Sequence, residues 1–567
     1  MSCRRSVIAA IWVFSGLLVS ETGAQALPDS APEFRRQQEQ VDQLRERNAP
    51  ENTLAPRGTL ATEDGRLPDE DPCRVLNTVR IEGNITEDLR AQLNEALSGG
   101  ALADPPQGRC LGGRGIQTLL DRLRNRLVAQ GCVTSHVSAP AQDLGAGELL
   151  LEVTMATIGR SDTGDSPLSP VGLALAHRSG QVLNLRDLEQ TLENLRRVPQ
   201  AKVNLDIKPG TEPGTSDIDI QFQPSKPVRV NLSLDDGGGR STGQWQGSAT
   251  IHWDNPSGNA DLFYVSLSPT VAGKEAGPRG SRSQVMHYSV PMGYWNIGLT
   301  STRSAYHQTI AGAFQSYVYS GRSDQTDIQV GRVLHRDGVS KTQASLKAFS
   351  RGSSNFIDDT EVEVQRRRTA GWELNLSHLH YIGSGVLDVQ WLYRRGTGAF
   401  GAMPAPEELF DEGTSRMKLM QLSATWQQPF SVADKTWRYM GHWRLQHNQT
   451  PLTPQDKFCA GGRHTVRGFD GKQSACADRG LLWRNEFSTS LGDGKPQLYF
   501  ALDHARLHRS QEQDPQTLTG AAIGLRQGWA MWGGQASVDA FVAQPVRKPA
   551  HIRTAKTTTG IQFYWVF

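Results

Sequence analysis

The alternation of apolar and polar residues divides the chain into a mixed N-terminal part and a long C-terminal part made of strands. From Val228 to the end, helical periodicity disappears and short alternating segments replace it. In LDVQWLYRR, one face carries only large apolar side chains, namely Leu387, Val389, Trp391 and Tyr393. The last segment, GIQFYWVF, alternates in the same way. This pattern is typical of a transmembrane β-barrel, apolar toward lipid and polar toward the lumen.

The length of this region sets the size of the predicted barrel. At roughly 20 residues per strand and turn, residues 227–567 provide about 16 antiparallel strands. A soluble β-sandwich also alternates and is the competing interpretation. The absence of a break in the pattern, the aromatic terminal strand and an export signal at the N-terminus favour an outer-membrane barrel.

Two small α/β units are predicted before the barrel, over residues 73–160 and 161–226. The first has the order strand, helix, helix, strand, strand, over residues 75–83, 86–99, 112–131, 132–140 and 147–159. The second has a helix and two strands, over residues 185–199, 202–210 and 216–222. Each unit is open at its edges, and an exposed strand edge can accept an extra strand from a partner.

The N-terminus predicts export. Arg4 and Arg5 precede an apolar run, and AQA follows, so residues 1–26 form a signal peptide. Residues 27–48 contain a helix with a capping box at Ser30 and Glu33. This helix is polar nearly all round, so it belongs in solvent or in a wet cavity. Residues 49–72 form a linker rich in Pro, Gly and acidic residues.

Charge and cysteine content exclude several classes of function. The net charge of +2 gives no reason to expect nucleic-acid binding. No cysteine or histidine cluster has metal-ligand spacing, so neither a metal nor another cofactor is expected. Five cysteines remain after cleavage, and Cys459 and Cys476 are the obvious local pair in an exported protein. Five is an odd number, and Cys132 is our choice for the unpaired thiol, although connectivity stays open.

One motif suggests a hydrolase. GRSTG places Ser241 in the GxSxG pattern, which requires a strand before the serine and a helix after it. Here an alternating segment follows, so Ser241 is expected in a polar turn. No catalytic constellation is found, and the protein is not expected to be an enzyme.

The most informative stretch is GGRHTVRGFDG, residues 461–471, because it holds Arg467 between glycines. In the strands that follow, Arg484 and Glu486 share the polar, lumen-facing side, and Asp503 faces the lumen by parity. Arg467 and Asp503 can therefore form a charge-assisted pair. The alternative is that both charges are merely solvated in a wet pore.

These residues resemble those of the two-partner secretion transporters, the TpsB family. GGRHTVRGFDG is similar to the sixth-loop motif of that family, with Val466, Arg467, Gly468 and Phe469 at its centre. RNEF and YFALDHARL are similar to the strands that follow the motif. GCVTSHVSAPAQDLGAGELLLEV and LNLRDLEQTLENLRRVP are similar to parts of its first and second POTRA domains. The resemblance covers nearly the whole mature chain.

The resemblance implies a 16-stranded outer-membrane barrel with two periplasmic POTRA domains. It implies that a helix of about Pro32 to Asn48 plugs the pore, and that Arg467 pairs with Asp503 to lock the sixth loop to the barrel wall. The family usually has glycine where Ala505 stands, so the backbone approach there changes slightly. It commonly has tyrosine in place of Cys132, which supports an unpaired thiol there. Cys73–Cys110 then corresponds to a staple of the first POTRA domain.

The function implied is export of one large, unfolded exoprotein without ATP, after recognition by the POTRA domains. Other expected partners are outer-membrane lipid and the barrel assembly machinery, and the protein is expected to be a monomer. Three alternatives stay open: a barrel that assembles other membrane proteins, a passive porin, and an outer-membrane hydrolase using Ser241. Whether the cargo is an adhesin, a hemolysin or a contact-dependent toxin is left open.

Overall fold

The computed structural model describes Gln37 and residues 65–162, 171–199, 201–223, 226–239, 241–273, 277–312, 314–492, 494–508 and 514–567. The predicted signal peptide and most of the predicted linker lie outside the described residues. Of the predicted plug helix only Gln37 is described, and it is helical and buried.

The first α/β unit packs two helices against a small sheet. Its sheet has the order β2-β5-β4, over Thr78–Glu82, Glu148–Thr154 and His136–Ser138. The helices α2, Glu87–Leu97, and α3, Gly113–Ala129, bury leucines against it. A second sheet pairs β1, Arg74–Leu76, with β3, Arg109–Leu111, and a disulfide joins Cys73, just before β1, to Cys110 in the middle of β3. This pairing agrees with the staple that the resemblance implies.

The second unit has one strand more than the sequence predicts. Its sheet has the order β6-β8-β7, over Thr157–Asp162, Thr215–Gln223 and Lys202–Pro209, with the helix α4, Leu185–Arg196, packed on it. The prediction of one continuous strand over residues 147–159 is wrong. The chain leaves the first sheet after Thr154 and enters the second at Thr157, where β6 runs parallel to β8.

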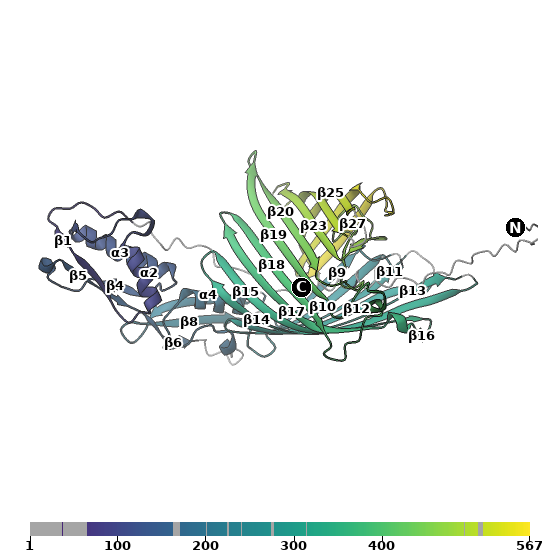
Figure 1. Ribbon diagram of the computed structural model, residues 1–567, viewed down its shortest axis with the longest axis horizontal. Coiled ribbons are helices and arrows are strands. Elements are labelled where there is room, and N and C mark those ends of the chain that lie inside the picture. Colours follow the sequence, from purple (N-terminus) through teal and green to yellow (C-terminus); the bar gives the residue numbers. More distant parts are fainter. Residues whose placement is uncertain are drawn as a thin grey trace, which may run out of the picture.

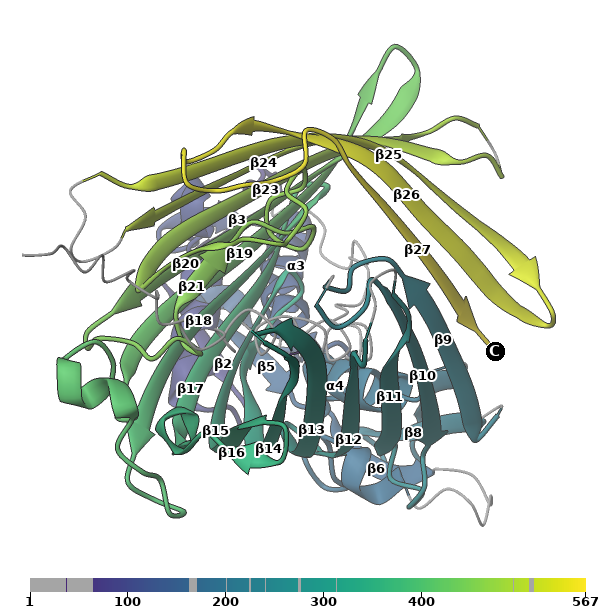
Figure 2. The same ribbon diagram turned by 90° about the vertical axis from the view of Figure 1, so that its right-hand side faces the viewer.

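The rest of the described chain forms a closed antiparallel barrel of sixteen strands, in agreement with the predicted number (Figures 1 and 2). The strands are β9 Val228–Asp235, β10 Trp245–Asp254, β11 Leu262–Ala272, β12 Gly280–Met292, β13 Trp295–Ala311, β14 Ser316–Arg336, β15 Ser340–Ile357, β17 Arg367–Ile382, β18 Gly385–Thr397, β19 Lys418–Val432, β20 Lys435–Asn448, β23 Arg479–Ser490, β24 Gln497–His508, β25 Gln516–Met531, β26 Gly534–Arg547 and β27 Thr558–Val566. The two-residue strand β16, Thr360–Glu361, adds to β15, and β27 pairs with β9 to close the barrel.

The two faces of the barrel differ as the alternation predicts. On β24, Phe500 and Leu502 are 43% and 52% exposed on the outer face, whereas Asp503 on the inner face is fully buried. Apolar side chains exposed all around the outer face form a surface suited to lipid. Short helical turns are η1 Gly100–Leu102, η2 Leu144–Ala146, η3 Val171–Ala174, η4 Glu363–Gln365 and η5 Pro406–Phe410.

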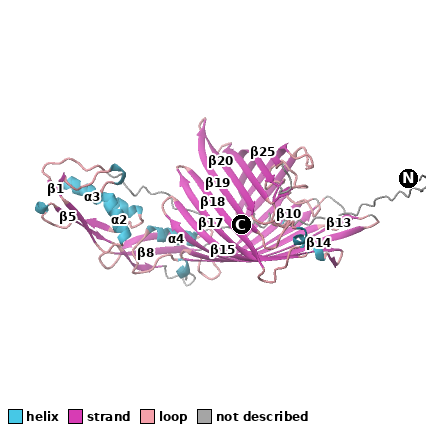
Figure 3. Ribbon diagram, in the orientation of Figure 1, coloured by secondary structure: helices cyan, strands magenta, loops and turns pink. Residues whose placement is uncertain are grey.

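The α-helices lie at the end of the molecule formed by the two N-terminal units, and strands dominate elsewhere (Figure 3). Within the described ranges, none of the helices combines the length and apolar character needed to span a membrane. The turns at residues 293–294 and 337–339 contact α4, so they mark the barrel end that faces the second unit. Because neighbouring strands are antiparallel, the connections over residues 236–239, 241–244 and 449–478 begin and end at the opposite end of the barrel.

Candidate functional site: loop 6 on the lumen wall

The long connection between β20 and β23, residues 449–478, is here called loop 6. Within it, β21, Phe458–Ala460, pairs with β22, Ala475–Ala477, and the disulfide Cys459–Cys476 joins them. This disulfide closes the base of the loop tip, residues 461–471, as predicted for the local cysteine pair. At Gly468 the backbone has a φ of 103°, and an added Cβ would lie 2.4 Å from the carbonyl oxygen of Gln544. Only glycine allows the tip to approach β26 this closely.

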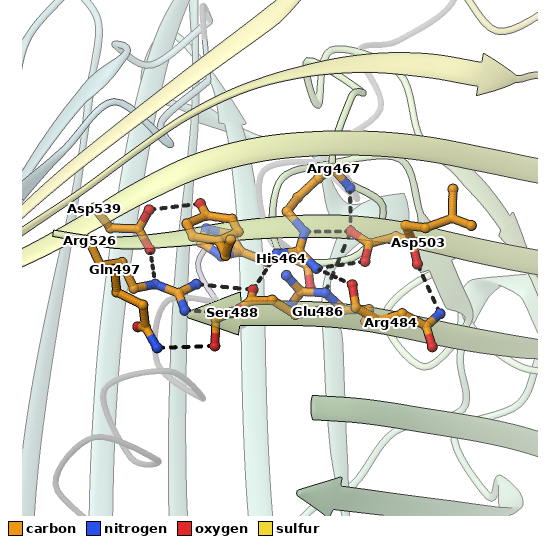
Figure 4. Close-up of polar contacts among 12 residues, drawn as sticks. His464, Arg467, Arg484, Glu486, Ser488, Gln497, Asp503, Arg526 and Asp539 are labelled. Carbon is orange, nitrogen blue, oxygen red and sulfur yellow. Dashed lines mark hydrogen bonds and ion pairs between the residues drawn. The ribbon is translucent and has the colours of Figure 1, made fainter. Parts of the chain in front are cut away.

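The structure brings Arg467 and Asp503 into direct contact (Figure 4). Arg467 donates from Nε to Asp503 Oδ2 at 2.7 Å and from Nη2 to Oδ1 at 2.8 Å, which makes the pair bidentate. Its backbone N–H also donates to Oδ2 at 3.0 Å. A third carboxylate oxygen, Glu486 Oε2, accepts from Arg467 Nη1 at 2.7 Å. Both partners are buried, so this is a desolvated cluster rather than a solvated surface pair.

The cluster continues along the wall beyond the residues predicted from sequence. Glu486 also accepts from Arg526 Nη2 at 3.1 Å, and Arg526 Nε donates to Asp539 Oδ2 at 2.7 Å. On the other side, Nε of Arg484 lies 3.8 Å from Oδ2 of Asp503, and Nη1 of Arg484 donates to the carbonyl oxygen of His464. Three arginines therefore alternate with three carboxylates across β23 to β26 (Figure 4), and each buried charge has an opposite charge beside it.

Apolar contacts support the same part of the loop. Val466 and Phe469 are buried against side chains of the inner wall, namely Leu482, Ala505 and Leu518. The methyl group of Ala505, where the family usually has glycine, is fully buried in this cluster. The tip is therefore held by ionic bonds on one flank and by apolar packing on the other.

Gly520 is a site residue that sequence reasoning missed. It lies on β25 opposite Asp503, and a Cβ added to it would lie 1.7 Å from the carbonyl oxygen of Arg467. A real Cβ cannot approach a backbone oxygen so closely, so the arginine can reach Asp503 only because residue 520 has no side chain.

We expect Gly520→Ala to displace the loop tip and to reduce secretion by at least about tenfold, because a shift of the Arg467 backbone breaks a buried bidentate pair. Secreted cargo in the medium and heat-modifiable barrel in the outer membrane give the two readouts. Gly528→Ala on the same strand is the matched control, since its nearest neighbour would lie at 3.7 Å. Equal secretion from both variants would contradict the requirement for glycine.

Arg463 links the loop tip to the strands that close the barrel. Its Nη1 donates to Asp236 Oδ1 at 2.7 Å, and its guanidinium lies 5.4 Å from the centre of the Phe541 ring. Asp236 follows β9 and also accepts from the backbone N–H of Ile561 in β27 at 2.9 Å. The direct pairing of β9 with β27 comprises five residue pairs. Arg463 also lies 3.7 Å from Asp235 of β9, and its guanidinium occupies the space that a Cβ on Gly560 of β27 would need, so loop 6 lies against both strands of the closing seam.

At the other end of the barrel, α4 of the second unit is held against the barrel mouth by buried charges. Glu193 accepts from Arg336 Nη1 and from Lys341 Nζ, both at 2.8 Å. Asp187 accepts from the hydroxyl of Tyr294 in the β12–β13 turn. Burial raises the pKa of Asp187 above its ordinary value, although the hydrogen bond from Tyr294 acts in the opposite direction. The second unit is therefore fixed to the barrel rather than free beside it.

Residues 214–527 match the family model described as haemolysin secretion/activation protein ShlB/FhaC/HecB. The chain belongs to this family. It also matches models for a ShlB-type POTRA domain over residues 79–155 and a POTRA domain over residues 169–209. The two α/β units are therefore POTRA domains, in agreement with the resemblance.

Curated relatives and solved structures give the same assignment for nearly the whole transporter. Outer membrane transporter CdiB-2 of Burkholderia pseudomallei is 32% identical over 460 residues, which cover 80% of this chain and 78% of the relative. CdiB from Escherichia coli superposes with a TM-score of 0.82 at 25% identity, covering 96% of this chain and all of that chain. CdiB from Acinetobacter baumannii superposes with a TM-score of 0.81 at 27% identity, covering 95% of this chain and all of that chain. The protein is an outer-membrane transporter that exports a cognate exoprotein by two-partner secretion.

The GRSTG motif around Ser241 does not have the surroundings that a catalytic serine of this pattern requires. Ser241 lies in the turn after β9, and the strand β10 follows it, so the strand–turn–helix arrangement of a hydrolase elbow is not formed. Among the described residues, no group of histidine, cysteine or acidic side chains could hold a metal ion. Arg526, Asp539 and Gly520 also belong to the site and lie on β25 and β26. The alternation predicted strands in this region but did not single out these residues.

Proposed function

We propose that the ion pairs of Arg467 with Asp503 and Glu486 lock the tip of loop 6 in the resting pore, and that this lock is required for export of the cognate exoprotein. The bidentate, buried geometry of Arg467 carries the proposal. A lock of this kind holds the tip in one position, and a chain threading the lumen must pass or displace it. The periplasm provides no ATP, so cargo binding and folding outside the cell supply the driving force.

The POTRA domains are proposed to recognise the cargo through their open strand edges. The edge strands are β4 and β2 in the first domain and β7 and β6 in the second. The C-terminal end of β7 is exposed, and its exposed residues include the apolar Ile207. An amphipathic segment of the cargo can add to such an edge by main-chain hydrogen bonds, with alternate side chains in contact with the domain.

The closed barrel supports a monomer, because no barrel edge is left for a second copy to complete. Insertion by the barrel assembly machinery, the absence of enzymatic activity and the plugging of the pore by residues 32–48 complete the proposal. We propose that the cargo is a large exoprotein encoded by a gene next to that of the transporter.

The test is co-expression of the transporter with this neighbouring exoprotein in a heterologous host. We expect the exoprotein in the medium only when the transporter is present, and we expect its N-terminal segment to bind the purified transporter. Retention of the exoprotein in the periplasm would contradict the proposal. Loss of other outer-membrane barrels on deletion of the gene would instead indicate an assembly factor, and an esterase activity lost in Ser241→Ala would indicate a hydrolase.

A further inference from the structure

Loop 6 has a second buried charge, Asp456, which precedes Arg467 in the same loop. Asp456 lies in the rising limb of the loop, residues 449–458, before the disulfide, and its side chain is fully buried. Arg351 donates from Nη2 to Oδ1 and Oδ2 of Asp456 at 3.1 and 3.2 Å. Arg394 donates to Oδ1 at 3.4 Å, and Thr453 donates to Oδ2 at 3.0 Å. Both carboxylate oxygens are therefore fully engaged.

The partners of Asp456 are themselves held in place on the wall. Arg351 on β15 donates from Nε to the hydroxyl of Thr369, and Arg394 on β18 donates from Nε to Glu373 Oε1 at 2.6 Å. Arg351 is buried, so Asp456 brings an opposite charge to a site where two arginines converge. Loss of that carboxylate would remove the negative charge that both arginines share.

The rising limb has further contacts with the same sector. Leu452 is fully buried against Phe349 of β15, against Leu419 of β19 and against Met417, which precedes β19. Gln455 donates to the hydroxyl of Ser353 at 2.9 Å. The Arg467 cluster uses β23 to β26 instead, and β19 and β20 separate β18 from β23 in the sheet. The Asp456 site and the Arg467 site therefore lie on different sectors of the wall, although Phe458, at the end of the rising limb, packs in the same apolar cluster as Val466 and Phe469 of the tip.

We infer that Asp456 is a second lock, which positions the rising limb of loop 6 on β15 and β18 independently of the Arg467 lock at the tip. When the tip leaves its site, Asp456 keeps the loop attached to the wall on one side. The loop then moves as a hinged unit whose fixed side is the rising limb. The role of this hinge in export rests on the proposed function of the tip lock, whereas the independence of the two locks does not.

Hydrogen exchange of the purified full-length transporter tests the two locks separately. We expect Asp456→Asn to raise exchange in residues 449–458 by at least about tenfold while residues 461–471 change less than about twofold, since removal of one lock opens only its own segment. Arg467→Gln is expected to give the reverse pattern. Asp434→Asn, in the exposed β19–β20 turn, is the matched control for loss of a carboxylate. General destabilisation would raise exchange in β15 and β18 as well.

A double variant assigns the effect to the ion pair. In Arg351→Gln combined with Asp456→Asn, residues 449–458 should exchange no faster than in Asp456→Asn alone, because both changes remove the same interaction. Unchanged exchange of residues 449–458 in Asp456→Asn would overturn the second lock. Simultaneous opening of both segments in either single variant would overturn the independence of the two locks.

Secretion is measured in parallel, so that failure of the two ideas can be told apart. We expect Asp456→Asn to lower secretion by about tenfold, and we expect its effect to multiply with that of Arg467→Gln, as for independent sites. Normal secretion by Asp456→Asn would overturn its role in export. Normal secretion by Arg467→Gln would contradict the proposed function of the tip, while the exchange pattern still decides whether Asp456 is a lock.

Discussion

Arg467→Glu is expected to abolish secretion while the barrel remains inserted in the outer membrane. The substitution places a third carboxylate against Asp503 and Glu486, both of which are buried. Loss of one partner from a buried pair costs about 3–5 kcal/mol, and the repulsion among the carboxylates adds to this. The tip of loop 6 then leaves the wall, although the backbone hydrogen bonds of the sixteen strands stay intact.

Immunoblots of the culture medium measure the exported cargo, and heat-modifiable migration of the membrane fraction measures the inserted barrel. Arg438→Glu makes the same change at an exposed arginine of β20 and should secrete normally. Arg467→Lys separates charge from geometry: lysine keeps the charge but cannot form the bidentate pair with Asp503, so an intermediate level is expected. Normal export by Arg467→Glu would contradict the lock.

Charge reversal at the barrel mouth is expected to have the second large effect. Glu193→Lys on α4 would face Arg336 and Lys341, both buried, and three cations would replace a compensated cluster. We expect the second POTRA domain to detach and secretion to fall at least about tenfold, because breaking a buried pair costs several kcal/mol. Hydrogen exchange of α4 and the β14–β15 turn measures detachment directly.

Glu212→Lys provides the control on the same domain, since Glu212 lies exposed in the β7–β8 turn. Combining Glu193→Lys with Lys341→Glu reduces the repulsion and should restore part of the secretion. A Glu193→Lys variant that keeps α4 protected and secretes normally would show that the buried cluster does not hold the domain. A variant that detaches but still secretes would show that docking is not needed for export.

Strand parity explains why part of the site was accessible from the sequence. The period of two in a strand puts Arg484 and Glu486 on one face, and it separates Asp503 from Phe500 and Leu502 without knowledge of any partner. The contact of Arg467 with Asp503 joins a loop to the barrel wall. Strand parity predicted that Asp503 faces the lumen, but it did not identify Arg467 as its partner. The resemblance to a family supplied the pairing itself.

The residues that sequence reasoning missed share a physical reason. Gly520 is needed because the carbonyl of Arg467 passes directly over it, a close approach set by the path of the loop and not by any local pattern. Asp456 lies in a loop, where no periodicity indicates which wall it faces. The break between β5 and β6 was missed because apolar residues continue through Met155 and Ala156, although the strand crosses there from one sheet to another.

The contact of Arg463 with Asp236 has a consequence for the order of folding. The two residues are 227 positions apart, and the bond of Asp236 with Ile561 spans 325 positions. Contacts between such distant segments form late, after the entropy of closing the intervening chain has been overcome. The Arg463 contact is therefore expected to form late, after the end of β9 has been brought beside loop 6. A barrel in which β9 has not yet reached its final place would be recognisable by an unanchored loop 6.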